Sequence, residues 1–264
     1  MQNILLTVSY DGTDFCGWQR QDDKDGGQAN RTVQAEIEAA LEKLCKEKLT
    51  LYGSGRTDSG VHALAQAANF YSPLDSMPAQ NYVRALNSFL PDDVRIVDAQ
   101  AVAEDFSSRK SATSRTYRYF ISFGDFVSAD NARFSWYVPN YTPDLKRLNQ
   151  YTQCLRGEHD CAAFAASGDE SLSTNRYIDN AHFFIQKDRW GKDQLVFEIE
   201  ANAFLWKMVR TLTGTLVNLD KNTAPPDAMQ KILESRDRTK AGVTAPPTGL
   251  FLYKINFDGT RRHI

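Results

Sequence analysis

The sequence lacks the features that mark membrane-spanning, exported and zinc-binding proteins. No apolar run in its 264 residues approaches the roughly 18 residues that cross a bilayer. The N-terminus lacks the basic and apolar segments of a signal peptide, and no two of the four cysteines form a C-x-x-C pair. Cys154, His159 and Cys161 lie close together, but their spacing fits no zinc pattern. We therefore expect a cytoplasmic protein that has reduced thiols, no metal ion and no association with a membrane.

The sequence also lacks the basic excess that is usual in non-specific nucleic-acid binders. Its formal net charge is -2, so a role in RNA binding has to rest on local clusters of cations. Four cations fall within ten residues without an acid among them, namely Arg109, Lys110, Arg115 and Arg118. From charge alone, the simpler interpretation of this cluster is a solvated surface.

Hydrophobic periodicity predicts a mixture of strands and helices. Alternating or β-branched apolar residues indicate strands at 4–10, 49–53, 65–71, 94–102, 116–123, 181–186, 195–200 and 250–257. Apolar residues at helical spacing indicate helices at 33–44, 81–89, 144–155, 204–219 and 227–234. This order predicts an α+β fold, in which a mixed, mainly antiparallel sheet has helices packed on one side. A weak boundary near residue 105 predicts two related halves, residues 1–105 and 106–264.

One segment combines the residue types of a functional site. Glycines at positions 53, 55 and 60 bracket Arg56-Thr57-Asp58-Ser59, and His62 follows shortly after. Glycine permits tight turns and a close approach of the backbone to a ligand. A loop that lies between strands and presents Arg, Asp and His is a common place for catalysis. The simpler alternative is a tight turn in which the aspartate caps the backbone, and composition alone leaves both open.

Asp58-Ser59-Gly60 also matches the D-[ST]-G sequence of aspartic proteases. Those enzymes need two such aspartates that share a proton, and the chain contains one copy, so a protease would have to be a homodimer. The preceding residues, Arg56-Thr57, are polar and cationic rather than an apolar strand. A neighbouring guanidinium keeps a carboxylate ionised, which opposes the sharing of a proton.

The segment Gly55–His62 closely resembles the signature loop of the tRNA pseudouridine synthase A family. Five further segments resemble motifs of that family and occur in the family's order, from about residue 7 to residue 252. They are Tyr10-Asp11-Gly12 with Phe15, Gly17-Trp18-Gln19 and Gln21; Thr32-Val33-Gln34; Arg115-Thr116-Tyr117-Arg118-Tyr119; Asn202-Ala203-Phe204-Leu205 with Met208-Val209-Arg210; and Pro247 with Gly249-Leu250 and Leu252. One such match alone is weak, whereas six in order are highly specific.

The resemblance implies a pseudouridine synthase fold and an isomerase that converts uridine to pseudouridine in the anticodon stem-loop of tRNA, at positions 38, 39 and 40. It implies that Asp58 is the essential catalytic residue. An ionised carboxylate can act as a nucleophile at the sugar or the base, or as an initiating base. The reaction leaves the oxidation state unchanged, so no cofactor is expected. Family members act as homodimers in which one tRNA contacts both subunits.

The resemblance also assigns roles to three side chains that the two halves would bring to one shared cleft. Arg210 lies in a largely apolar stretch, where a lone cation needs a partner, and that partner would be Asp58. Tyr117 would stack on the target base, because extruded nucleotides are held by aromatic faces. Leu250 would form an apolar wall of the same pocket.

Further cations gain a role from the resemblance. Arg56 would contact a phosphate or fill the gap left by an extruded uridine. The four cations between residues 109 and 118, and more weakly Arg20, would contact RNA phosphates. His62 is expected to be a structural hydrogen-bonding residue rather than an acid or a base.

The chain departs from the family pattern at two places. The polar loop Asp22–Arg31 is longer than expected for the family, and Cys161 stands where the family has an aromatic residue. Two other functions therefore stay as alternatives. One is an RNA-binding protein without catalytic activity, and the other is a dimeric aspartic protease.

Overall fold

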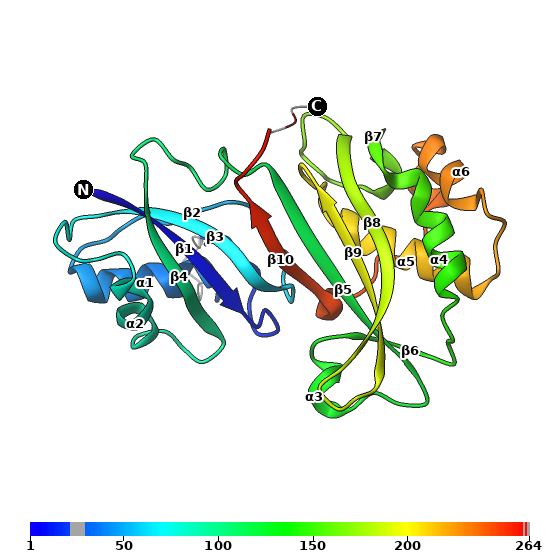
Figure 1. The fold of residues 1–264 in the computed structure, drawn as a ribbon, viewed down its shortest axis with the longest axis horizontal. Helices are drawn as coiled ribbons and strands as arrows, with labels where there is room; N and C mark the ends of the chain where they lie inside the picture. Colours follow the sequence, from blue (N-terminus) through cyan, green and yellow to red (C-terminus); the bar gives the residue numbers. More distant parts are fainter. Residues whose placement is uncertain (22–29, 261, 263–264) are drawn as a thin grey trace. The chain divides into compact units, whose positions relative to one another are not determined.

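A computed structural model describes residues 1–21, 30–260 and 262 of the chain. The contacts between residues group it into two compact units (Figure 1). The first unit consists of residues 1–113 with 251–259, and the second of residues 114–250 with 260–264.

This grouping differs from the expected division at residue 105. Residues 106–113 and nearly all of the last strand belong to the first unit, although the sequence places them in the second half. Of the loop expected at Asp22–Arg31, residues 22–29 lie outside the described residues.

The first unit contains a sheet in which β1 (Gln2–Tyr10) lies between β3 (His62–Ser72) and β4 (Val94–Val102). Both neighbours run antiparallel to β1. On the other side of β3, β10 (Leu250–Asn256) runs parallel to it, and the short β2 (Tyr52–Gly53) also pairs with β3. The loop that contains Asp58 therefore runs between two strands of this sheet.

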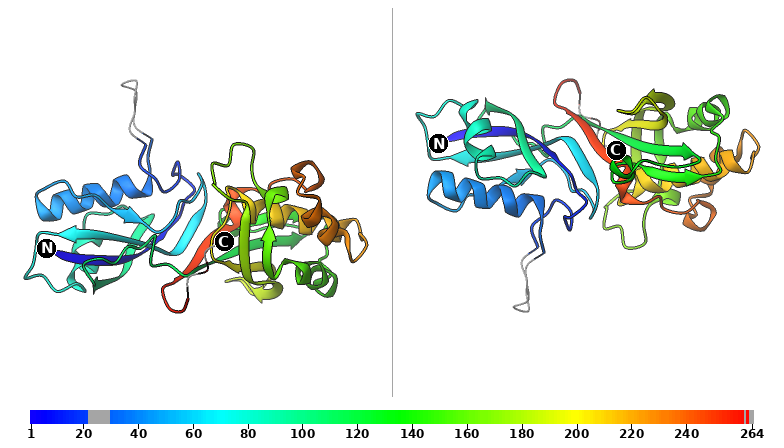
Figure 2. Two further views of the ribbon diagram at one scale, coloured as in Figure 1. Left: turned by 90° about the horizontal axis from the view of Figure 1, so that it is seen from above. Right: turned by 90° about the horizontal axis from the view of Figure 1, so that it is seen from below.

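Two helices complete the first unit, α1 (Val33–Cys45) and α2 (Asn81–Asn87). Figure 2 shows α1 as a layer beside the strands. Its buried residues recur at helical spacing, and alternate residues of β1 are buried with them, as a core between a helix and a sheet requires. These core residues are Val33, Ile37, Ala40 and Leu41 of α1, and Ile4, Leu6 and Val8 of β1.

The second unit contains a sheet with the strand order β5 (Ser114–Gly124), β9 (Asp193–Ala201), β8 (Asn175–Lys187) and β7 (Gly157–Asp160). These neighbours are all antiparallel. A further strand, β6 (Trp136–Pro139), runs parallel to the C-terminal end of β5.

The helices of the second unit are α3 (Ala129–Ala132), α4 (Leu145–Thr152), α5 (Met208–Lys221) and α6 (Ala228–Ser235). The expected start of α5 at residue 204 is wrong by four residues. Lys207 adopts a left-handed backbone conformation with φ of 59°, so the helix cannot extend through it.

The expected fold class, a mixed and mainly antiparallel α+β fold, is confirmed. The strands β6 and β7 were not expected, because four residues are too few to establish a period of two. In the described part of the chain, no helix is long and apolar enough to cross a membrane.

Candidate active site

Asp58 is half-buried in a loop. Residues 10–18, which we call the N-terminal segment, contact this loop before and after Asp58. The amide of Trp18 donates to the carbonyl of Thr57 at 3.2 Å. The hydroxyl groups of Tyr10 and Thr57 lie 2.7 Å apart and form a buried hydrogen bond. Tyr10 and Trp18 are 4% and 2% exposed, so the residue directly before Asp58 is attached to the core.

The residues after Asp58 form a turn that is also fixed by the N-terminal segment. The amide of Val61 donates to the carbonyl of Asp58 at 3.1 Å, and Gly60 adopts a positive φ of 75° that favours glycine. The carbonyl of Phe15 accepts two hydrogen bonds, from the amide of Gly60 at 3.3 Å and from the hydroxyl of Ser59 at 3.1 Å. Both flanks of Asp58 are therefore held by one segment of the chain.

Two glycines of that segment allow the close approach. A Cβ atom on Gly12 would lie 2.0 Å from the carbonyl oxygen of Val61, which is far inside van der Waals contact. A Cβ atom on Gly17 would lie 2.6 Å from the carbonyl oxygen of Thr57, and Gly17 has a positive φ of 91°. The glycines of the N-terminal motif are therefore needed for contact with the Asp58 loop.

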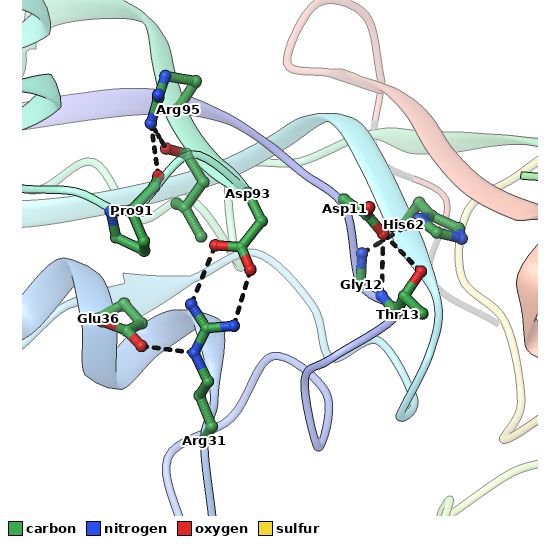
Figure 3. Close-up of polar contacts among 10 residues, drawn as sticks. Asp11, Gly12, Thr13, Arg31, Glu36, His62, Pro91, Asp93 and Arg95 are labelled. Carbon is green, nitrogen blue, oxygen red and sulfur yellow. Dashed lines mark hydrogen bonds and ion pairs between the residues drawn. The ribbon is translucent and has the colours of Figure 1, made fainter. Parts of the chain in front are cut away.

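His62 ends the loop and is fully buried at the start of β3. Its Nδ1 accepts a hydrogen bond from the amide of Gly12 at 3.0 Å and lies 3.2 Å from the carboxylate of Asp11 (Figure 3). The ring stacks on Phe251 with centroids 4.5 Å apart. These contacts are those of a structural histidine.

In the second unit, Tyr117 stands half-buried on β5. Its ring meets the ring of Phe204 edge-on, with centroids 5.1 Å apart. Phe204 follows Asn202, whose side-chain oxygen accepts hydrogen bonds from the amides of Tyr177 and Ala203. The turn between β9 and α5 thus positions the aromatic residue that supports Tyr117.

Arg210 lies in the first turn of α5 and is tied to the segment before β10. Its Nε donates to the carbonyl of Ala245 at 2.7 Å, and the amide of Ala245 donates back to the carbonyl of Arg210 at 3.1 Å. The hydroxyl of Tyr119 donates to the next carbonyl, that of Pro246, at 2.6 Å. Burial raises the pKa of Tyr119, and the positive charge of Arg210 partly offsets that effect.

Leu250 is 6% exposed and follows a short turn at Pro247–Gly249. A Cβ atom on Gly249 would lie 2.6 Å from the carbonyl oxygen of Phe120 and 2.6 Å from the ring of Tyr119. The glycine therefore lets this turn pack against β5, on which Tyr117 also stands.

The amino-acid sequence matches the model of a known protein family. The model of the tRNA pseudouridine synthases matches residues 6–109 and 152–258, which is more than half of the chain. The chain belongs to the tRNA pseudouridine synthase family. Enzymes of this family isomerise uridine to pseudouridine, and the chain is an isomerase of that kind.

Curated relatives support the assignment over nearly the whole length. The chain is 52% identical to the tRNA pseudouridine synthase A of Treponema denticola, covering 97% of this chain and 93% of that protein. Identity to the enzyme of Treponema pallidum strain Nichols is 44%, over 92% and 84% of the two chains. Identity to the enzyme of Brachyspira hyodysenteriae is 42%, over 97% and 99%.

The structure distributes the cations that the sequence places in one cluster. Arg109 and Lys110 are exposed in the first unit, whereas Arg115 and Arg118 stand on β5 in the second. Side chains three residues apart on a strand point to opposite faces, so the two arginines of β5 do not share a surface. Arg115 shares the face of Tyr117.

The arginines that are expected to contact RNA are either paired with protein groups or exposed. Nη1 of Arg115 donates to the carbonyl of Asn202 at 2.8 Å, and Nε of Arg118 pairs with its cross-strand neighbour Glu198 at 2.6 Å. Arg20 is 55% exposed and pairs with Glu38. Arg56 is exposed in the Asp58 loop.

In the described part of the chain, no group of three or more His, Cys, Asp or Glu side chains could hold a metal ion. Burial raises the pKa of the Cys154 thiol to about 11 and that of the Cys161 thiol to about 12.

Two residues near the Asp58 loop were assigned no role of their own from the sequence. Phe15, which belongs to the N-terminal motif, holds the turn through its carbonyl, and its ring lies against the guanidinium of Arg31. The only signal for Arg31 in the sequence was a cation two residues before the start of α1, and its partner Asp93 is 62 residues away along the chain.

Proposed function

We propose that this enzyme converts uridine to pseudouridine at positions 38, 39 and 40 in the anticodon stem-loop of tRNA, with Asp58 as the essential catalytic residue. The observation that carries the proposal is the construction of the Asp58 loop. The family motifs nearest the N-terminus are hydrogen-bonded to both flanks of Asp58, and Asp58 itself is half-buried. Catalysis requires that the reacting side chain is held in a productive position.

The chemistry fits an ionised carboxylate. The reaction breaks the bond between N1 of uracil and C1′ of ribose, turns the ring, and joins C5 to C1′. The carboxylate of Asp58 acts as a nucleophile at the sugar or the base, or as the initiating base. No electrons are gained or lost, so the reaction needs no redox cofactor.

The proposal also assigns roles to three side chains of the second unit. Arg210 is the ionic partner that keeps Asp58 charged and oriented, because a charge-assisted hydrogen bond favours the ionised form. Tyr117 is the platform on which the extruded base stacks, and Leu250 forms an apolar wall. Support comes from the family membership and from the way each side chain is positioned on β5, α5 or the turn before β10.

The substrate contacts extend beyond the target base. Arg56 contacts a phosphate or fills the gap left by the extruded uridine. Phosphates are also contacted by Arg20, Arg109, Lys110, Arg115 and Arg118. With a formal net charge of -2, one chain has no overall positive charge to attract RNA, so we propose a homodimer that binds one tRNA with both subunits. Sedimentation of the active enzyme as a monomer would contradict the dimer.

The test is a map of pseudouridine in unmodified tRNA transcripts after incubation with the enzyme. We expect modification at positions 38, 39 and 40 wherever these are uridines. Modification in another arm would contradict the proposed substrate site while leaving the family assignment intact. Pseudouridine formation at the wild-type rate by the Asp58→Ala variant would contradict the proposed role of Asp58.

The two alternatives give different results in the same assay. A non-catalytic RNA-binding protein binds the transcript and forms no pseudouridine. A dimeric aspartic protease cleaves peptides and is inhibited by pepstatin. Membership of the synthase family favours neither alternative.

A further inference from the structure

Arg31 lies two residues before the start of α1, and its guanidinium binds two carboxylates (Figure 3). Nη1 and Nη2 donate to the two carboxylate oxygens of Asp93 at 2.7 and 3.0 Å, and Nε donates to Glu36 at 2.8 Å. The hydrogen bond to Asp93 contributes most to raising the pKa of Arg31. Bidentate pairing fixes the orientation of a guanidinium as well as its position. We call these three residues the Arg31 clamp.

The Arg31 clamp reaches the Asp58 loop through Phe15. The guanidinium carbon of Arg31 lies 4.1 Å from the centroid of the Phe15 ring, which is a cation–π contact. The carbonyl of Arg31 also accepts a hydrogen bond from the amide of Cys16 at 2.8 Å. The carbonyl of Phe15 in turn accepts the hydrogen bonds from Ser59 and Gly60. One residue therefore separates the Arg31 clamp from the turn that follows Asp58.

Asp93 connects the Arg31 clamp to the other end of the loop. Its carbonyl accepts a hydrogen bond from the amide of Asp11 at 3.0 Å. The residue after Asp11 is Gly12, whose amide donates to His62 where the loop enters β3 (Figure 3). The clamp thus contacts the segments that hold the loop at residues 59–60 and at residue 62.

We propose that the Arg31 clamp positions Asp58 for catalysis, which makes Arg31 and Asp93 positioning residues. This inference rests on the proposed role of Asp58. The side chains of Arg31 and Asp93 are 37% and 23% exposed, so solvent limits what their pair adds to global stability. The pair acts locally on the position of Asp58, because it holds Phe15, and Phe15 accepts the hydrogen bonds from the turn that follows Asp58. Displacement of a catalytic group by about 1 Å costs on the order of 100-fold in rate.

An alternative role for Arg31 is contact with an RNA phosphate. The two roles predict different effects of a substitution at Asp93. If Arg31 positions the loop, Arg31→Met and Asp93→Asn both lower kcat, and the double variant is no slower than the slower single variant. If Arg31 binds phosphate, Asp93→Asn releases the cation and leaves kcat unchanged. Arg31→Met then raises KM and reduces the salt dependence of tRNA binding by about one phosphate contact.

The experiment measures kcat and KM on a tRNA transcript, the melting temperature, and the hydrogen exchange of the Gly60 amide. For Arg31→Met and Asp93→Asn we expect kcat to fall by roughly 10-fold or more while KM stays within about twofold. We also expect faster exchange at Gly60, because its amide donates to Phe15. Arg31→Lys should be intermediate, since lysine keeps the charge but loses the planar fork.

Arg95→Met is the matched control. Arg95 is an arginine of the same unit that pairs with Asp92. Its guanidinium otherwise donates to the carbonyls of Pro91 and Val94, and Figure 3 shows the contact with Pro91. This variant loses an ion pair whose carboxylate is fully exposed, and we expect wild-type kcat and Gly60 exchange.

The possible results separate the clamp from the proposed function. Wild-type kcat in both Arg31→Met and Asp93→Asn would overturn the clamp, and so would a rise in KM alone. Asp58→Ala is assayed in the same series. If Asp58→Ala is inactive while the clamp variants keep the wild-type kcat, the positioning role of the clamp is wrong and the catalytic role of Asp58 stands. If Asp58→Ala is as active as wild type, the proposed catalytic role is wrong and the clamp has nothing to position.

Discussion

The two groups of candidate residues are built in different ways. In the first unit, the Asp58 loop is held by hydrogen bonds between the loop and a neighbouring segment, and two glycines let that segment approach. In the second unit, Tyr117 and Arg210 stand on a strand and a helix, and each side chain has its own supporting contact. The first group therefore depends on the fit of two backbones, and the second depends on the identity of the side chains.

The sharpest test of this comparison is Gly12→Ala in the first unit. The added Cβ atom would lie 2.0 Å from the carbonyl oxygen of Val61, so the loop or the N-terminal segment has to move. We expect kcat to fall by on the order of 100-fold, because the substitution displaces Asp58 without removing a reacting group.

Gly55→Ala is the control for Gly12→Ala. A Cβ atom on Gly55 would meet no described atom within 4 Å, although Gly55 belongs to the same loop. Its melting temperature should match the wild type, whereas that of Gly12→Ala should be lower. Equal activity and equal melting temperatures for the two variants would show that backbone fit is not what holds Asp58.

In the second unit, substitution of Arg210 should lower kcat, because it removes the positive charge and the N–H donors of the guanidinium. Removal of a charge-assisted hydrogen bond costs about 2 kcal/mol, so Arg210→Met should lower kcat by roughly 30-fold. Arg210→Lys keeps the charge and should retain more activity. Steady-state kinetics of the three proteins on one transcript checks this order, and equal rates for all three would remove Arg210 from the proposed site.

The smallest effect is expected at Tyr117. Stacking of one base on an aromatic side chain contributes about 1–3 kcal/mol, so Tyr117→Ala should weaken the use of tRNA by roughly 10-fold or more in kcat/KM. Tyr117→Phe keeps the aromatic face and its edge-on contact with Phe204, so we expect nearly wild-type kinetics. A loss in Tyr117→Phe as large as in Tyr117→Ala would mean that the hydroxyl matters rather than the stacking face.

Much of the fold could be predicted from periodicity. The strand β4 has the expected bounds, Val94–Val102, because its apolar residues and flanking turns are local signals. The start of α5 could not be predicted, since the left-handed conformation of Lys207 is one that lysine rarely adopts. The short strand β6 exists only because it pairs with β5.

The sequence names candidate residues for the site but does not indicate the contacts that hold them. The glycines of the N-terminal motif indicate that some backbone approaches closely, yet only the structure identifies Thr57 and Val61 as the contacts. Arg31 and Asp93 carry no local pattern, because their pairing joins segments 62 residues apart. Long-range contacts of this kind are set by the fold as a whole.

The most direct test of the account is a single-turnover assay of Asp58→Asn with the enzyme in excess over radiolabelled tRNA. Asparagine has nearly the size of aspartate but no charge, so the loop and its hydrogen bonds from the N-terminal segment should persist. We predict that the variant binds the transcript with wild-type affinity, melts at the wild-type temperature and forms no pseudouridine. Pseudouridine formation at a rate close to that of the wild type would contradict the claim that the loop exists to hold a catalytic carboxylate.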